Sequence, residues 1–211
     1  MLKVYEYSHL GGSEILQVRY PQINAEIDDV ISAVQVPERT KVSREKTNAG
    51  TLLYSPKEMN AGFKDQFRVR GYVEMKDKYT ITIPNWDKAI VGAFKQVDFV
   101  KDRVLIEVQF GKYAFMFYDL AKFQYFFNES KAEVGVEIVP CHGLHALMST
   151  GVSYGEQLVY DIERLRKHFP AVPVKIILLD VELSDAERQQ RERLLEAQEE
   201  AESIEDQEAG V

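Results

Sequence analysis

The sequence predicts one α/β domain, built on a mixed β-sheet with helices on both faces. Two observations support this fold class. Residues 96–110 alternate between apolar and polar side chains in two runs, which is typical of a β-hairpin. After them, the periodicity predicts a helix, a strand, a helix and a strand, an order that returns parallel strands to one sheet. The expected sheet therefore contains both antiparallel and parallel pairs.

The elements before this hairpin follow from periodicity and from helix-start residues. Ser8 can cap the first helix, and Pro21 precedes the second. The third helix has the strongest start, because Ser55 stands at the N-cap, Pro56 takes the first helical position and Glu58 completes a capping box. In chain order, the sequence predicts a strand over 2–7, helices over 8–19, 23–34 and 56–67, and strands over 67–74 and 79–83.

The elements after the hairpin alternate between helix and strand. They are predicted as a helix over 115–127, a strand over 134–139, a helical turn over 144–148, a helix over 156–168 and a strand over 174–181. The chain has 211 residues and is 45% hydrophobic, which suffices for one sizeable core. We therefore expect a single domain over residues 1–181.

The remaining residues, 182–211, form an acidic tail. It holds eleven acidic and three basic residues, an imbalance equal to the net charge of −8, so residues 1–181 are neutral. Ser184 and Glu187 form a capping box, but few large apolar residues follow. The predicted tail helix should therefore be solvated or frayed, and tolerant of deletion.

Within the hairpin, two carboxylates are expected on one face. Glu107 alternates with apolar residues in the second strand, and a turn at Lys101 and Asp102 would put Asp98 opposite Leu105. Asp98 would then be the diagonal neighbour of Glu107, with Cα atoms about 7–8 Å apart. Two carboxylates at that separation can hold one divalent ion, and Mg²⁺ suits hard oxygen ligands. A solvent-facing polar strip is the alternative interpretation of the same spacing.

The residues around this pair resemble a known catalytic core. Asp98, followed by the run Ile106-Glu107-Val108-Gln109-Phe110-Gly111-Lys112-Tyr113, resembles the PD-(D/E)xK nuclease motif with glutamine in place of lysine, as in BstYI/BglII-like type II restriction endonucleases. Further segments resemble this family in chain order, namely residues 7–10, 41–47, 55–56, 134–138, 149–154 and 170–173. The resemblance implies a restriction-endonuclease-like fold and a type II site-specific deoxyribonuclease.

The resemblance also implies roles for individual residues. Asp98 and Glu107 match the acidic metal ligands, and the backbone carbonyl of Val108 matches a further ligand. Gln109 occupies the position of the family's lysine, but it is neutral and can only position a water or a phosphate oxygen through hydrogen bonds. More of the charge stabilisation is then expected from bound Mg²⁺.

Contacts with DNA are expected outside the metal site. Lys112, just past the second hairpin strand, can donate to a guanine edge. The resemblance implies that Thr150 and Ser153 lie in a loop that contacts bases, although a helix-capping turn is the alternative. A basic polar segment suits the DNA backbone, with a solvated loop as its alternative. Its cations are Lys41, Arg44 and Lys46.

The family likeness also implies a target and an assembly. It is closest to enzymes that cut double-stranded DNA at purine-GATC-pyrimidine after the outer purine and leave 5′-GATC overhangs. A palindromic site implies a homodimer with one active site per strand. The helix over 115–127 is more apolar than one core face needs, so part of the dimer interface is expected there or on its neighbours.

The cell compartment can be inferred from composition. No apolar stretch approaches the roughly 20 residues that a membrane span needs, and the N-terminus carries charge too early for a signal peptide. Cys141 is the single cysteine, which fits a reducing compartment. We expect a cytoplasmic protein, whose host also has a cognate DNA methyltransferase that forms no stable complex with it.

Two other features of the sequence are interpreted as structural. Cys141, His142 and His145 supply only three possible zinc ligands, without a matching pair elsewhere. Glu14 could approach the metal from the first helix, but a solvent-facing position is the better interpretation. Two rival functions remain. One is another nuclease of the same core, which would keep Asp98 and Glu107 but cut by DNA structure. The other is a sequence-specific DNA-binding module that has lost catalysis, as Gln109 in place of lysine would suggest.

Overall fold

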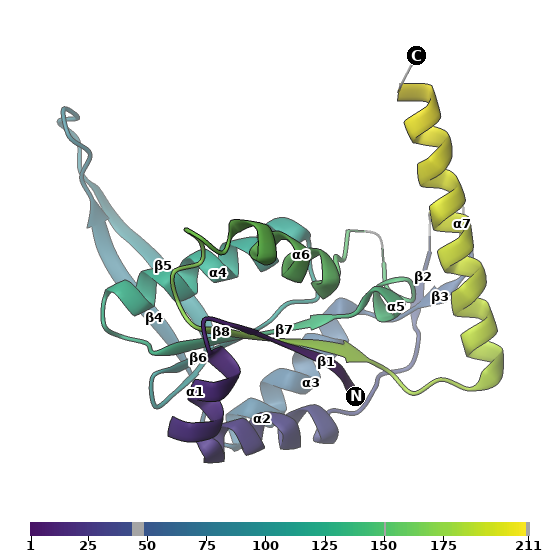
Figure 1. Cartoon of the computed structure of the whole chain (residues 1–211), viewed down its shortest axis with the longest axis horizontal. Helices are drawn as coiled ribbons and strands as arrows, with labels where there is room; N and C mark the ends of the chain where they lie inside the picture. Colours follow the sequence, from purple (N-terminus) through teal and green to yellow (C-terminus); the bar gives the residue numbers. More distant parts are fainter. Residues whose placement is uncertain (44–48, 150, 210–211) are drawn as a thin grey trace.

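The centre of the protein is a six-stranded mixed sheet in the order β1-β8-β7-β6-β5-β4 (Figure 1). This computed structural model describes residues 1–43, 49–149 and 151–209, and the side chains of these residues other than 198, 199 and 201–209. Strands β6, β7 and β8 run parallel, whereas β1 and β5 pair antiparallel with the sheet and β4 with β5. The strands are β1 (Leu2–His9), β4 (Val73–Ile81), β5 (Ile90–Lys101), β6 (Val104–Val108), β7 (Val134–Pro140) and β8 (Val174–Asp180).

Helices cover both faces of this sheet, as expected for its apolar parallel strands (Figure 1). One face carries α4 (Tyr113–Asn128) and α6 (Gly155–Leu165). The other carries α1 (Gly12–Arg19), α2 (Pro21–Ala33) and α3 (Pro56–Val69). Every residue of β6 and β7 is buried. The predicted mixed sheet with helices on both faces is confirmed.

Close packing fixes the two helical layers against the sheet. On one side, the Phe67 ring of α3 stacks on Phe99 of β5 with ring centroids 4.6 Å apart. On the other side, α4 lies so close to β7 that a Cβ atom on Gly135 would meet the Phe123 ring at 2.4 Å. Asp98 lies at an irregularity of β5, between Val97, which pairs with Met75, and Val100, which pairs with Val73, and it lines pockets on both sides of the sheet.

Several predicted boundaries are correct and others are wrong. The side chain of Ser55 accepts from the Glu58 amide and caps α3, as predicted. The predicted strands over 67–74 and 79–83 are wrong, because α3 continues to Val69 and one strand, β4, follows it. Ser8 lies in β1 and is not the N-cap of α1, although its Oγ accepts from the Ser13 amide at 3.1 Å.

The hairpin turn also differs from the prediction. Phe99 pairs with Ile106 and Lys101 pairs with Val104, so the turn is Asp102 and Arg103 and not Lys101 and Asp102. Both turn residues have positive φ, 48° and 69°, as a type I′ turn requires. The true register is shifted by two residues from the predicted one. Such a shift leaves every side chain on its predicted face, because strand side chains alternate with period two.

Strands β4 and β5 extend beyond the body as a projecting arm (Figure 1). Residues 82–89 form its tip, and Trp86 there is 62% exposed. A separate ribbon, β2 (Lys41–Val42) with β3 (Leu52–Leu53), was not predicted and lies beside α7 (Asp185–Ala209) (Figure 1). A short helix, α5 (His142–His145), follows β7.

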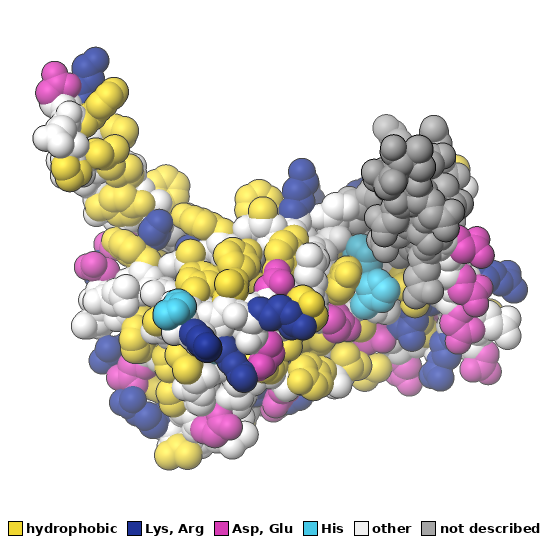
Figure 2. Space-filling view, turned by 45° about the horizontal axis from the view of Figure 1, so that its top comes forward, with side chains coloured by type: hydrophobic (Ala, Val, Ile, Leu, Met, Phe, Trp, Pro, Cys, Tyr) yellow, Lys and Arg dark blue, Asp and Glu magenta, His cyan; other side chains and the backbone are white. Residues whose placement is uncertain are grey.

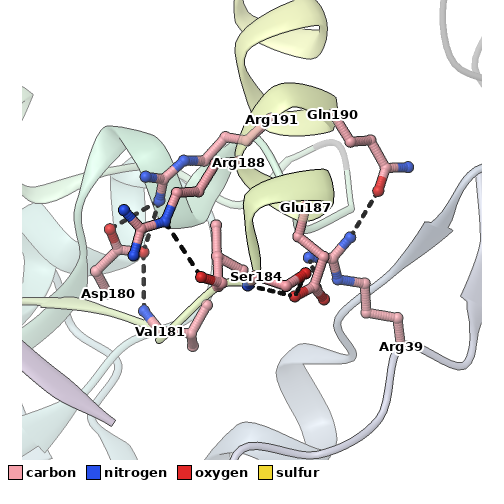
Figure 3. A network of polar contacts seen from close by, with 9 residues as sticks. Arg39, Asp180, Val181, Ser184, Glu187, Arg188, Gln190 and Arg191 are labelled. Atoms are coloured by element: carbon pink, nitrogen blue, oxygen red, sulfur yellow. Dashed lines mark hydrogen bonds and ion pairs between the residues drawn. The ribbon is translucent and has the colours of Figure 1, made fainter.

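The first turns of α7 are fastened to the body by a polar network (Figure 3). Arg191 forms an ion pair with Asp180 at the end of β8, 2.8 Å, and Arg39 contacts Glu187 at 3.2 Å. Ser184 donates to Glu187 as the capping box predicts. Leu194 is buried in the core, so the prediction that this helix buries no useful face is wrong for its first half.

Within the residues that the structure describes, no helix combines the length and the apolar character needed to cross a membrane.

Candidate active site

Three acidic residues lie in a row across adjacent strands. Phe99 pairs with Ile106, so Asp98 on β5 and Glu107 on β6 follow the last paired position of these two strands, and both line the same pocket. Glu107 in turn pairs with Glu137 on β7. Glu107 and Glu137 face α4, and Asp98 lines the pocket on that side as well as the one on the α3 side. The predicted pair is therefore brought together in one pocket.

The row runs from solvent into the core. Asp98 is exposed, Glu107 is 3% exposed and Glu137 is fully buried. The interpretation of Glu107 as part of a solvent-facing polar strip is therefore excluded. Because charged groups rarely stay buried without partners, the surroundings of Glu107 decide what it can do.

Helix α4 supplies those partners from one of its turns. Lys122 forms ion pairs with Glu107 and with Asp119, the latter at 2.7 Å. Asp119 is 2% exposed and its other oxygen accepts from Gln109 Nε2 at 3.2 Å. Glu107, Gln109, Asp119 and Lys122 thus form one connected cluster, which we call the acid cluster together with Glu137.

Negative charge exceeds positive charge in the acid cluster. Burial, followed by the negative charges of Asp119 and Asp98, raises the pKa of Glu107 to about 8 despite the opposing effect of Lys122. Burial also raises the pKa of Asp119. The ammonium of Lys122 is partly desolvated, which lowers its pKa, but Glu107 and Asp119 outweigh that effect and raise it. Lys122 therefore stays charged.

Glu137 is the innermost member of the acid cluster. Among the described residues, no donor forms a hydrogen bond with either of its carboxylate oxygens. Its burial and the charges of Asp119 and Glu107 raise the pKa of Glu137 well above the ordinary 4.5. A buried carboxyl without a donor is held in the neutral acid form, because that form avoids the cost of an unpaired buried charge.

Asp98 lies where two pockets meet. One pocket, of about 390 Å³, lies on the α4 side and includes Glu107, Gln109 and Lys122 in its wall. The other, of about 490 Å³, lies on the α3 side and includes Val108. Its wall also has three side chains at every fourth position of α3, which share one helix face. These are Asn60, Lys64 and Arg68.

The donor set at this position fits a divalent cation. Asp98 and Glu107 provide hard oxygen ligands from adjacent strands, and the excess of carboxylates favours an added positive charge. The backbone N–H of Gln109 donates to the Ile138 carbonyl on β7. The carbonyl of Val108 belongs to the same peptide group and therefore points the other way, toward β5 and Asp98. The described residues hold no group of three His, Cys, Asp or Glu side chains able to enclose a metal. Mg²⁺ needs fewer than three such side chains, since it usually keeps several waters as ligands.

Several predicted DNA contacts lie together at the carboxyl ends of β6 and β7. Lys112 is exposed at the N-cap of α4, and its Cε is 3.9 Å from the Cβ position of Gly151. The Ser153 amide donates to the Gly111 carbonyl at 2.8 Å, which joins the loop over 149–154 to the strand end. Ser153 itself is buried and its hydroxyl contacts Gln157. Lys112 is therefore the accessible donor of this group.

Lys41 is exposed on β2, which belongs to the separate two-stranded ribbon and not to the central sheet. The ribbon reaches the same edge, because the Tyr54 amide just after β3 donates to the Leu147 carbonyl at 2.9 Å. The remaining predicted DNA contacts, Arg44, Lys46 and Thr150, lie outside the described residues.

The two features interpreted as structural have local partners. Glu14 lies on α1, on the opposite face of the sheet from Lys122, and accepts from Ser8 at 2.5 Å. Cys141 is buried, and its sulfur accepts from the Leu144 amide at the N-terminus of α5. The His142 and His145 rings stack with centroids 5.7 Å apart. Within the described part of the chain, none of these side chains belongs to a metal-binding group.

Three residues of the acid cluster were missed by the sequence analysis: Asp119, Lys122 and Glu137. A signal for two of them was present, since Asp119 and Lys122 are the only charged residues of the 16-residue helix α4 and stand three positions apart. Charges on one face of an apolar helix usually have partners. Glu137 had no comparable signal, because an acid in an alternating strand is usually solvent-facing.

Comparisons with known proteins agree with this fold. The family model described as "Restriction endonuclease BglII/BglIII" matches residues 4–179. The crystal structure of restriction endonuclease BglII complexed with a DNA 16-mer is similar at 22% identity and a TM-score of 0.65, over 87% of this chain and 80% of that chain. The crystal structure of free BglII is similar at 19% identity and a TM-score of 0.58, over 87% and 82%. No curated protein sequence matches.

Proposed function

Because the chain belongs to the BglII/BglIII restriction endonuclease family, and is thus a type II site-specific deoxyribonuclease, we propose that it hydrolyses DNA at a palindromic GATC-centred site with Mg²⁺. The proposed site is purine-GATC-pyrimidine, cut after the outer purine to leave 5′-GATC overhangs. The observation that carries the proposal is that Asp98, Glu107 and Gln109 line one pocket.

In this proposal, each residue of the pocket has a distinct task. Asp98, Glu107 and the Val108 carbonyl would hold Mg²⁺, which would supply activation of a water and neutralisation of the charge on the phosphate. Gln109 uses its amide to orient a water or a phosphate oxygen, while its bond to Asp119 fixes the side-chain rotamer. The exposure of Asp98 leaves that carboxylate accessible from solvent, where DNA would approach.

Recognition is proposed to lie beside this pocket. Lys112 addresses a guanine edge, since it is exposed at the end of the loop that follows β6. Thr150 and Ser153 are proposed to read the outer base pair. Phosphate contacts are proposed for Lys41, Arg44 and Lys46. The solved complex of BglII with a DNA 16-mer supports double-stranded DNA as the partner.

We also propose that the enzyme is a homodimer, because one protomer cannot present the same surface to both halves of a palindrome. Hydrophobic side chains cover much of the arm and continue onto the body beside it (Figure 2). On α4, Phe115 is 55% exposed and Tyr118 is 48% exposed. This apolar surface is the proposed interface. The enzyme is proposed to act in the cytoplasm, where a cognate DNA methyltransferase would protect host sites.

A digest tests the proposal. Unmethylated plasmid DNA is incubated with the protein and Mg²⁺, and the fragment ends are sequenced. The proposal predicts discrete fragments that all carry 5′-GATC overhangs, with the flanking base showing which outer pairs are accepted. Structure-directed nicks would indicate another nuclease on the same core. Sequence-specific binding without cleavage would indicate a DNA-binding module.

A further inference from the structure

A cation of the chain already occupies the proposed catalytic pocket. Lys122 Nζ lies between Glu107 and Asp119 and forms an ion pair with each. The side chain of Lys122 is 13% exposed, and it shares the pocket wall with Asp98 and Gln109. Its ammonium is therefore in contact with the carboxylate that the proposed function assigns to the metal.

Pairing both Lys122 and a divalent ion closely with Glu107 costs electrostatic free energy. An ammonium and a divalent ion repel each other, and that repulsion is strong where water is largely excluded. Glu107 is almost fully buried, so water does little to screen the repulsion between two cations beside it. Binding of a divalent ion at Glu107 thus requires Lys122 to move away from that carboxylate or to share it.

DNA would offer Lys122 a further partner besides Asp119, namely a phosphate oxygen in the pocket. The pocket is open and lined by the polar groups of Lys95, Gln96 and Gln109 in addition to Lys122. A phosphate oxygen held there would lie within reach of the flexible four-carbon stem of a lysine. Gln109 carries no charge, so Lys122 is the cation nearest to the buried carboxylates that could face that phosphate.

We propose that Lys122 is an internal counter-ion that exchanges partners: it pairs with Glu107 in the free enzyme and moves to a DNA phosphate, which frees Glu107 for the divalent cation. This inference rests on the proposed function, because it takes Asp98 and Glu107 as the metal site. Lys122 would then make metal binding depend on DNA. By linkage, the divalent cation must raise the affinity for DNA by the same factor.

The experiment measures Mn²⁺ affinity from the electron paramagnetic resonance signal of the free ion. It uses the full-length wild type and the variants Lys122→Gln, Lys122→Arg and Lys95→Gln, first without DNA and then with a hydrolysis-resistant duplex. Lys95→Gln is the matched control: it removes the same charge from the same pocket, but Lys95 contacts the Tyr118 hydroxyl at 3.3 Å and not Glu107. Circular dichroism confirms that each variant is folded.

The inference predicts opposite results for the two lysines. Without DNA, Lys122→Gln should bind Mn²⁺ at least about tenfold more tightly than wild type, while Lys95→Gln changes affinity less than about threefold. DNA should raise the Mn²⁺ affinity of wild type and Lys122→Arg, but much less that of Lys122→Gln. Equal or weaker Mn²⁺ binding by folded Lys122→Gln overturns the inference.

Two further outcomes keep the inference and the proposed function apart. If Lys122→Gln does not fold, the test is the Mn²⁺ affinity of the wild type with and without DNA. An affinity that DNA does not change contradicts partner exchange. If Asp98→Asn binds Mn²⁺ as tightly as wild type, the metal site itself is assigned wrongly, and both proposals fail. A metal site lost in Asp98→Asn but unchanged in Lys122→Gln refutes only the role of Lys122.

Discussion

Glu137 on β7 pairs directly with Glu107 on β6, and both carboxyl groups are buried beneath α4. Lys122 forms an ion pair with Glu107, whereas the oxygens of Glu137 meet no hydrogen-bond donor among the described residues. Burial raises the pKa of both acids, but at Glu107 the charge of the paired Lys122 opposes this effect, whereas Glu137 has no paired donor in the described part of the chain. This difference makes Glu107, and not Glu137, the buried carboxylate available to a metal.

Replacing Gln109 with leucine should slow cleavage and leave DNA binding intact. Leucine removes the amide that would orient water or phosphate, and loss of one such donor typically costs about 10²–10³ in rate. Single-turnover cleavage is measured with Mg²⁺ and DNA affinity with Ca²⁺. Gln96→Leu is the control, since Gln96 lines the same pocket but donates to Glu74 at 2.8 Å. Equal rates for the two variants would show that Gln109 has no special role.

Replacing Lys112 with methionine should change base preference more than overall affinity. A base contact discriminates by about 1–3 kcal/mol against the wrong pair, whereas a phosphate contact affects all sequences alike. The relative cleavage rates of a set of sites, each with one substituted base pair, provide the measurement. Lys41→Met is the comparison, because it should weaken every site by a similar factor. An unchanged order of preference for Lys112→Met would rule out its role in recognition.

The α3 face that lines the second pocket should contact the DNA backbone. Lys64 and Arg68 are exposed there beside Asp98. Each phosphate contact contributes about 0.9 to the slope of log affinity against log salt concentration. The double variant Lys64→Gln, Arg68→Gln should lower that slope by about 1.8, whereas Lys57→Gln, on the same helix but outside the pocket, should not. A slope unchanged in the double variant contradicts this contact.

Stability in acid should depend on Glu26. Burial opposes its charge, but bonds from Lys101 at 2.7 Å and Tyr72 at 3.1 Å outweigh it and hold the pKa of Glu26 below the ordinary 4.5. This contribution is present above pH 4.5 and is lost as pH falls through the lower pKa of the folded state. Chemical unfolding from about pH 6 to about pH 3 should therefore show a smaller loss of stability in Glu26→Gln than in wild type. The exposed Glu192→Gln should behave as wild type.

Much of the fold and the central pair could be predicted from the sequence, because both depend on periodicity. Asp98 and Glu107 were correctly expected to lie together even though the turn was misplaced, since a two-residue shift preserves alternation. The turn itself could not be predicted. Asp102 and Arg103 both adopt positive φ without a glycine or asparagine, and packing of the flanking strands must impose this geometry.

The remainder of the acid cluster depends on contacts between distant parts of the chain. Lys122 reaches Glu107 because α4 packs against β7 and β5, on either side of β6, and no local pattern encodes that packing. Leu194 likewise becomes buried only because α7 is fastened through Arg191 to the end of β8. The sequence around Leu194 is polar, which suggested solvent exposure there.

The central claim is that Asp98 and Glu107 form a metal-dependent catalytic pair. Single-turnover cleavage of a GATC-centred duplex in Mg²⁺, with DNA affinity measured in Ca²⁺, tests it most directly in Asp98→Asn and Glu107→Gln. The account predicts that cleavage falls by at least about 10³ in both variants while DNA affinity stays within about tenfold of wild type. Cleavage at the wild-type rate by either folded variant, or loss of DNA binding in both, would contradict it.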